Sequence, residues 1–239
     1  MADPKLVIII GVGSGLGGAI SRRFAAAGHP VAMAARSSID TDKIAADIQA
    51  SGGRALAFAI DAEDGTAVAS VFDRAETKYG SVGVAIFNVS GRVQKSFLDI
   101  SAAEMEQTWR SGFLTAFHTG SEAARRMVPR GEGKIFFTGA PASRRGMPNN
   151  APYAAAKFGV RAMAQSMARE FSPQGIHVAH FTLGGGVGNE NRTKRDPELA
   201  SRDGLMSIEA LAETYYQTYL QPRSCWAFDV EMRPWNRAF

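Results

Sequence analysis

The chain has 239 residues, of which 45% are hydrophobic and 21% are charged, a composition that excludes a disordered tail or a fibrous repeat. Its 27 Lys and Arg residues outnumber 23 Asp and Glu residues, so the net charge is +4. The basic residues form no cluster of the kind that binds nucleic acid, and we expect no nucleic-acid partner. Solubility, or a modest bias towards an anionic small molecule, explains the excess.

The sequence also shows no sign of an oxidising compartment, a membrane span or a metal site. Cys225 is the single cysteine and has neither a disulfide partner nor nearby zinc ligands. No apolar run approaches the roughly 20 residues that cross a bilayer, and the first residues lack the basic start of a secretory signal. The four histidines, His29, His118, His177 and His180, have no metal-ligand spacing. We expect a cytoplasmic protein without a metal.

Short β-branched segments alternate with longer alanine-rich amphipathic segments along most of the chain. We predict strands at residues 5–10, 30–35, 54–60, 84–87, 134–138, 176–181 and 226–231. We predict helices at residues 15–28, 41–51, 64–79, 102–129, 151–171 and 207–220. This alternation is typical of βαβ units. It predicts one α/β domain over residues 1–239, a doubly wound parallel sheet with helices on both faces.

Residues 184–204 depart from this alternation. They begin with three glycines, continue with mixed charges and show little periodicity. A segment of about 20 residues without a helix or strand is unusual in a compact domain and commonly covers a ligand. We therefore predict a substrate-binding loop or lid over residues 184–206, with a mobile surface loop as the alternative.

A glycine-rich turn joins the first predicted strand to the first helix in LVIIIGVGSGLGGAI. Without side chains, such a turn lets the backbone approach a pyrophosphate, which then meets the free N–H groups of the helix N-terminus. Purely structural glycines are the alternative, but the strand and helix on either side favour a nucleotide. The expected contacts are Gly11, Gly13, Ser14, Gly15, Leu16 and Gly17.

The end of the second predicted strand indicates which nucleotide binds. A preference for NAD requires a carboxylate there to hold the ribose 2′-hydroxyl, whereas this strand ends in Ala35 and Arg36. Asp40 comes too late in the chain to be a confident substitute. A guanidinium suits a 2′-phosphate, so Arg36 predicts NADP (NADPH) in preference to NAD. A solvent-exposed arginine is the alternative.

Tyr153 and Lys157 stand four residues apart in the alanine-rich segment 151–171. On a helix, residues at this spacing share one face. An ammonium beside a phenol lowers the phenol pKa from about 10 towards the range of a general acid. A Tyr-Lys pair on a surface helix is common by itself, but here it follows a strand in a chain that begins with a nucleotide motif.

Taken together, these motifs resemble those of the short-chain dehydrogenase/reductase family up to about residue 185. Gly11, Gly15 and Gly17 match the T-G-x-x-x-G-x-G motif, although Ile10 replaces its threonine. The resemblance implies a Rossmann fold, a homodimer or homotetramer, Tyr153 as proton donor and Lys157 as ribose anchor. It also implies cofactor contacts, with Tyr153 and Lys157, from Asp61, Ala62, Asn88, Ser90, Gly91 and Gly184.

Two catalytic positions of the family are substituted in this chain. Ala140 stands where the family has a serine, and Ser111 or Gly112 stands where it has a helix asparagine. Losing such a hydrogen bond to the substrate costs on the order of a hundredfold in rate. The hydroxyls of Thr138, Ser143 and Ser90 are candidates to replace the serine.

The sequence therefore predicts an NADP-dependent oxidoreductase that acts on a small-molecule carbonyl or secondary alcohol. The alternative is a catalytically weak or silent member that binds the nucleotide in a structural or sensing role, because one fold hosts many functions. The family resemblance implies that pairing of the helices at 102–129 and 151–171 forms the oligomer, with plain packing of these helices on the sheet as the alternative. The aromatic tail at 225–239 closes either the substrate pocket or an interface.

Overall fold

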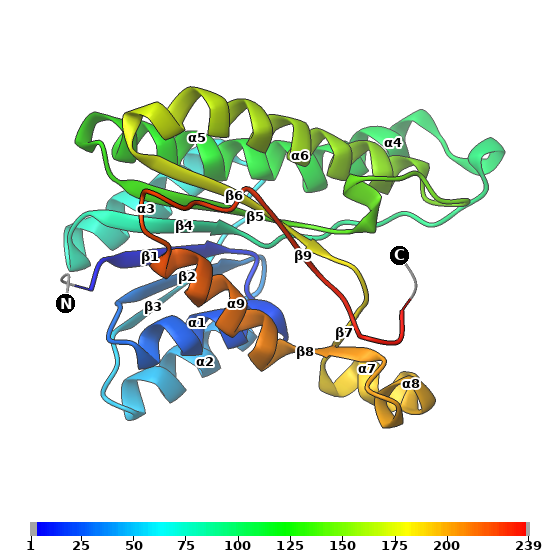
Figure 1. The fold of residues 1–239 in the computed structure, drawn as a ribbon, viewed down its shortest axis with the longest axis horizontal. Helices are drawn as coiled ribbons and strands as arrows, with labels where there is room; N and C mark the ends of the chain where they lie inside the picture. The colour runs from blue at the N-terminus through cyan, green and yellow to red at the C-terminus, as the bar shows by residue number, and fades with distance from the viewer. Residues whose placement is uncertain (1–3, 238–239) are drawn as a thin grey trace.

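A computed structural model describes residues 4–237 as a seven-stranded parallel sheet with helices on both faces (Figure 1). The strands are β1 (Leu6–Ile10), β2 (Val31–Ala35), β3 (Ala55–Ala59), β4 (Val82–Phe87), β5 (Gly133–Gly139), β6 (Ile176–Leu183) and β9 (Asp229–Met232). Their order across the sheet is β3-β2-β1-β4-β5-β6-β9. The predicted doubly wound fold is confirmed, and each predicted strand is present within a few residues of its expected bounds.

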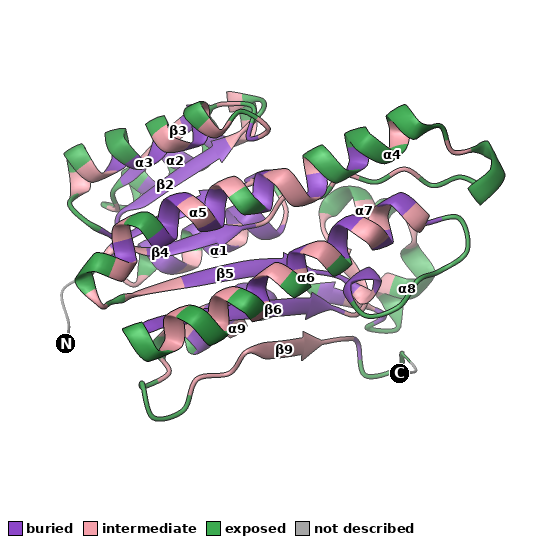
Figure 2. Ribbon diagram, turned by 90° about the horizontal axis from the view of Figure 1, so that it is seen from above, coloured by how far each residue is buried: buried purple, intermediate pink, exposed green. Residues whose placement is uncertain are grey.

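The main helices form two layers. They are α1 (Leu16–Ala26), α2 (Ser38–Ala50), α3 (Gly65–Tyr79), α4 (Ala102–Trp109), α5 (Thr115–Met127), α6 (Ala151–Phe171) and α9 (Ile208–Leu220). Helices α3, α5 and α6 pack on one face, and α1, α2 and α9 pack on the other (Figure 1). Along β1, Leu6 and Ile8 point to the first layer and Val7 to the second, because successive side chains alternate. The buried residues accordingly lie in the strands and on the inward faces of the helices (Figure 2).

Two helix predictions need correction. Helix α2 begins three residues earlier than expected, because the Ser37 side chain caps it by accepting a hydrogen bond from the Ile39 N–H. The predicted helix 102–129 is not continuous: a π-helical turn, Arg110–Leu114, separates α4 from α5. Such turns insert one residue into an α-helix and occur frequently at functional sites. Short 3₁₀ helices lie at Phe97–Asp99, Val128–Arg130, Pro141–Ser143 and Ser172–Gln174.

The expectation that residues 184–204 lack helix and strand was wrong. They contain β7 (Gly186–Gly188), α7 (Glu190–Arg195) and α8 (Pro197–Ser201), and β7 pairs in parallel with β8 (Leu205–Ser207). The Asn189 side chain caps α7 by accepting from the Arg192 N–H at 2.8 Å. Elements this short have too few residues to show a period in the sequence.

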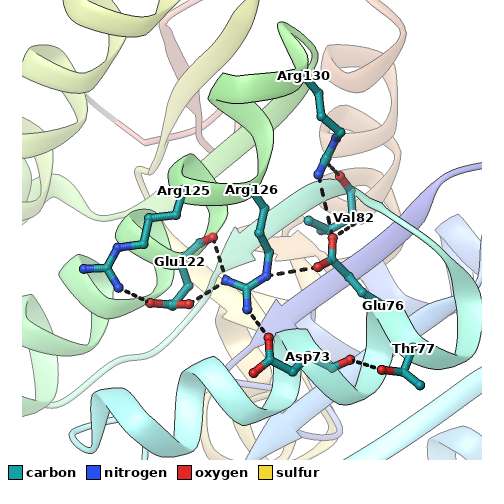
Figure 3. Close-up of polar contacts among 8 residues, drawn as sticks. All are labelled: Asp73, Glu76, Thr77, Val82, Glu122, Arg125, Arg126 and Arg130. Atoms are coloured by element: carbon teal, nitrogen blue, oxygen red, sulfur yellow. Dashed lines mark hydrogen bonds and ion pairs between the residues drawn. The ribbon is translucent and has the colours of Figure 1, made fainter.

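An ion-pair network joins α3 to α5 (Figure 3). Arg126 on α5 contacts Glu76 and Asp73 on α3, and it also contacts Glu122 one turn earlier on its own helix. Only 17% of the Arg126 side chain is exposed. The network therefore fixes the two helices against each other at their solvent edge. No helix within residues 4–237 is long and apolar enough to cross a membrane.

Candidate active site

The candidate site lies at the carboxyl ends of the strands, where the strand order reverses. Strand β1 lies between β2 and β4, so the connections leave it in opposite directions and open a crevice. Two cavities of about 780 Å³ and about 430 Å³ lie there. They share four lining residues that follow β4, namely Asn88, Val89, Ser90 and Arg92. The segment after β4 is therefore the junction between the two cavities.

The glycine-rich turn is held tightly against this segment. Gly11 has a φ of +97°, and a Cβ there would lie 2.6 Å from the carbonyl carbon and oxygen of Asn88. The Asn88 side chain donates from Nδ2 to the Gly11 carbonyl oxygen at 2.9 Å. A Cβ on Gly17 would lie 2.8 Å from the same carbonyl oxygen. These two glycines are required by close backbone packing, which leaves the turn open on its cavity side.

The larger cavity has the features expected of a dinucleotide site. Gly11 and Gly13 line it at the turn, Arg36 lines it at the end of β2, and Asp61 and Ala62 line it after β3. Asn88, Ser90 and Gly91 complete its floor at the junction. Ser14, Gly15 and Gly17 shape the turn without lining either cavity, and Leu16 lines the smaller one. The glycine-rich turn and the volume of the larger cavity fit a nicotinamide dinucleotide.

One carboxylate in this cavity was not expected from the sequence. Asp40, in the first turn of α2, accepts a hydrogen bond at Oδ2 from the Ser14 N–H at 3.0 Å. Because α2 begins early, its first turn reaches over the glycine-rich turn. Arg36 and Asp40, which have opposite charges, therefore line the same cavity.

Tyr153 and Lys157 both line the smaller cavity from α6. The Lys157 side chain is buried and donates from Nζ to the carbonyl oxygens of Thr138 at 3.0 Å and Val89 at 3.1 Å. Burial lowers the pKa of Lys157 from its ordinary value of 10.5 to about 8, because desolvation penalises the charged form. The lysine thus ties α6 to the ends of β4 and β5.

The expected lowering of the Tyr153 pKa is not observed. Burial of the phenol raises its pKa above the ordinary value of 10.0, and a hydrogen bond from Ser90 and the charge of Arg92 only partly oppose this. The Lys157 Nζ lies 5.9 Å from the centroid of the tyrosine ring and is directed towards backbone carbonyls. The effect of burial therefore exceeds the electrostatic effect that the helical spacing predicted.

The three candidate hydroxyls have different surroundings. Thr138 is paired through its hydroxyl with that of Tyr215 at 2.8 Å, on the face of the sheet that α9 covers. Ser143 is fully buried and accepts the Ala140 N–H at 3.2 Å. Among the three, only Ser90 affects the phenol: it opposes the rise in the Tyr153 pKa, and it lines the smaller cavity together with that tyrosine.

The substituted positions are also visible in the structure. Ala140 packs with Ala142 and Ala154, and Tyr153 packs against this cluster, so the substituted position is a neighbour of the tyrosine. At the π-helical turn, Ser111 lines the larger cavity and donates from Oγ to the Gln107 carbonyl oxygen at 2.9 Å. A Cβ on Gly112 would lie 2.9 Å from the Cβ of Ala156, so this glycine faces α6 instead.

Gly184 is separated from the other predicted cofactor contacts. It lines a third cavity of about 190 Å³ together with Arg144 and Glu231, and its N–H donates to the Met232 carbonyl oxygen at 2.6 Å. The next glycines, Gly185 and Gly186, line the smaller of the two main cavities instead. Of the three glycines, Gly185 and Gly186 line the site, whereas the predicted contact Gly184 does not.

Sequence reasoning missed three arginines of the smaller cavity, Arg92, Arg192 and Arg237. Arg92 directly follows the predicted cofactor contacts Asn88, Ser90 and Gly91, and this position was a usable signal. Arg192 and Arg237 lie in segments without a recognisable motif, so only the fold brings them to the site. Within residues 4–237, no group of three or more His, Cys, Asp or Glu side chains could hold a metal ion.

Comparison with known proteins gives consistent results. A family model described as short chain dehydrogenase matches residues 5–198. The crystal structure of a short-chain dehydrogenase from Rhodopseudomonas palustris superposes with a TM-score of 0.84 at 37% identity, covering 96% of this chain and 98% of that one. A short-chain dehydrogenase/reductase of Armillaria gallica is 28% identical over 187 residues, which are 77% of this chain and 72% of that protein. An alcohol dehydrogenase from Thermococcus sibiricus, complexed with 5-hydroxy-NADP, has the same fold, with a TM-score of 0.86, 20% identity and 99% of both chains covered.

Proposed function

The chain belongs to the short-chain dehydrogenase family of oxidoreductases, and from this premise we propose that it is an NADP-dependent reductase or dehydrogenase of a small-molecule carbonyl or secondary alcohol. The observation that carries the proposal is that Tyr153, Lys157 and Ser90 line the same cavity, the smaller of the two. A fold alone does not establish an activity, so the assignment depends on these side chains.

Each side chain has a distinct role. The nicotinamide, when bound, supplies or accepts the hydride. Tyr153 donates a proton to the carbonyl oxygen, and its raised pKa keeps the phenol protonated at neutral pH. Ser90, which lines the same cavity as the phenol and opposes the rise in its pKa, takes the place of the serine that Ala140 replaces. Lys157 presents a buried positive charge at the junction, where a ribose hydroxyl would be held.

Variants of these residues test the proposal. Tyr153→Phe should lower kcat for carbonyl reduction with NADPH by about 10²–10⁴-fold, because it removes the proton donor. Ser90→Ala should lower kcat by on the order of tenfold to a hundredfold. Ala140→Ser places a hydroxyl beside the phenol and should restore part of the activity of Ser90→Ala. A loss of kcat in Thr138→Val or Ser143→Ala, with Ser90→Ala unaffected, would mean that the hydroxyl is misassigned.

A broad panel of ketones and aldehydes tests whether the protein is an enzyme at all. NADPH oxidation by the wild type should exceed that by Tyr153→Phe for some member of the panel. If the two are equal throughout while NADPH still binds, the protein is a silent nucleotide-binding member. A large gain from Ala140→Ser alone would show that the remaining machinery is intact.

The cofactor preference depends on the two opposed charges of the larger cavity. We propose that Arg36 holds the 2′-phosphate of NADP, so that NADPH binds roughly tens to thousands of times more tightly than NADH. Arg36→Ala should bring the two dissociation constants, measured by fluorescence, close together. Asp40→Asn should tighten NADPH by removing a negative charge. Equal constants, or tighter NADH, in the wild type would instead make Asp40 the selecting residue.

A further inference from the structure

The two cavities of the site differ sharply in charge. The larger cavity mixes Asp40, Asp61 and Glu63 with its arginines. The smaller cavity is lined by four cationic side chains, Lys157, Arg92, Arg192 and Arg237, and by no aspartate or glutamate. Unbalanced positive charge in a partly enclosed cavity concentrates an anion there. The smaller cavity therefore carries an excess of positive charge around Tyr153.

Three of these cations are already engaged or lie at the rim. Lys157 is bound to two backbone carbonyls, and Arg192 forms an ion pair with Asp196. Arg237 is exposed, in the tail that the Asn236 side chain ties to the Arg202 carbonyl oxygen at 2.9 Å. The tail therefore contributes a cation to the mouth of the cavity.

Arg92 is also exposed, but it lines both cavities and has the geometry of an anion ligand beside Tyr153. Its guanidinium carbon lies 5.6 Å from the centroid of the Tyr153 ring. Its Nε donates to Asn150 Oδ1 at 3.1 Å, and Asn150 is itself buried and donates from Nδ2 to the Pro148 carbonyl oxygen at 2.8 Å. Within residues 4–237, no ion pair engages Arg92. The orienting bond at Nε leaves the two Nη groups as a fork that suits a carboxylate.

We propose that the substrate is a short oxo acid or the corresponding hydroxy acid, whose carboxylate is held by Arg92 while its carbonyl oxygen faces Tyr153. This inference rests on the proposed function and adds the substrate class. In the reduction, the carbonyl carbon gains a hydride from the reduced nicotinamide, which is thereby oxidised. The π electron pair of the carbonyl moves to its oxygen, which takes the Tyr153 proton, and the carboxylate is unchanged.

Matched pairs of substrates test the charge requirement. Acetoacetate, 2-oxobutanoate and 4-oxopentanoate are compared with their methyl esters, which keep the ketone and remove the charge. For at least one pair, we expect wild-type kcat/KM with NADPH to be at least about tenfold higher for the acid. Arg92→Gln should remove this advantage mainly through KM for the acid, by about 10- to 100-fold, and leave the ester almost unchanged.

The control is Arg145→Gln, which removes the same charge from an exposed arginine of the third cavity. It should leave both kcat/KM values within about twofold. Arg192→Gln separates the other source of an anion, the cofactor pyrophosphate. If Arg192→Gln raises the dissociation constant of NADPH and Arg92→Gln does not, then Arg192 serves the cofactor and Arg92 serves the substrate.

A binding measurement keeps the inference independent of turnover. Calorimetric titration of the protein–NADP⁺ complex with each oxo acid should show binding that Arg92→Gln abolishes and Arg145→Gln preserves. Equal turnover of esters and acids by the wild type would overturn the inference and leave the proposed function standing. If the wild type turns over neither the acids nor the esters but still binds the acids, the proposed function is wrong and the inference about the carboxylate stands. Acid binding that is unaffected by Arg92→Gln would overturn the inference in every case.

Discussion

Lys157 shows how burial changes the behaviour of a single side chain. The residue is 2% exposed, and its ammonium has backbone carbonyls, not a carboxylate, as partners. Burial lowers its pKa to about 8, so the charge is present at neutral pH and is lost within the mildly alkaline range. A spacing of four residues in the sequence indicated the pair with Tyr153, but it could not indicate this depth.

The affinity for NADPH should therefore fall as pH rises through about 8, because the neutral amine no longer attracts the anionic cofactor. We expect the dissociation constant to rise about threefold to tenfold between pH 7.5 and 9, measured by fluorescence at constant ionic strength. Tyr153→Phe should show the same dependence, since the raised pKa of Tyr153 keeps that phenol protonated over this range. Lys157→Met should bind more weakly without the dependence. Persistence of the full dependence in Lys157→Met would contradict this assignment.

At the scale of elements, α3 and α5 are joined by a single well-placed guanidinium. Arg126 reaches three carboxylates, two of them on α3 (Figure 3). The adjacent Arg125 side chain is 72% exposed, and its one ion pair within residues 4–237 is with Glu122. Hydrogen bonds to charged groups contribute more when they are shielded from water, and exposed pairs contribute little. Arg125 is therefore a suitable control for a stability measurement on Arg126.

Arg126→Ala should lower the free energy of unfolding by about 1.5–3 kcal/mol, because it removes the charged hydrogen bonds that the half-buried guanidinium donates to Glu76 and Glu122. Arg125→Ala should lower it by less than about 1 kcal/mol. Urea unfolding followed by circular dichroism gives both values. Similar losses for the two variants would show that the network contributes no more than a surface ion pair.

Elements also show where sequence patterns are insufficient. The period of 3.6 residues extended through 102–129, but the π-helical turn breaks the helix where Gly112 lets α6 approach closely. The short elements between 186 and 201 lack a period altogether, although Asn189 and Pro197 are recognisable starts of helices. In both cases packing between distant segments decides the local structure.

At the scale of the whole molecule, the outer face of α5 and α6 carries an exposed apolar groove. A groove of about 400 Å³ there is lined by Phe117, Met163, Met167 and Phe171, and Phe117 is 47% exposed. Exposed apolar patches of this kind commonly mark association surfaces. We propose that two copies of the chain associate through this face, as the family resemblance implied.

Phe117→Glu should therefore reduce the mass measured by light scattering to that of a smaller assembly, because the charge would be buried in the interface. Leu220→Glu is the control, since Leu220 is 51% exposed on α9 in the opposite layer. It should leave the mass unchanged. A wild-type protein that is monomeric at micromolar concentration would refute the proposal outright.

The sequence by itself determined the α/β class, the seven strands, the glycine-rich turn and the Tyr153–Lys157 pair, because these depend on local periods and on conformations that only certain residues adopt. Only the tertiary structure decided how the candidate hydroxyls differ: Ser90 follows β4 and lines the smaller cavity with Tyr153, whereas the hydroxyl of Thr138 is paired with that of Tyr215. It also decided the charge of this smaller cavity. Arg92, Arg192 and Arg237 are far apart in the chain and meet only because parallel strands deliver their following segments to one edge of the sheet.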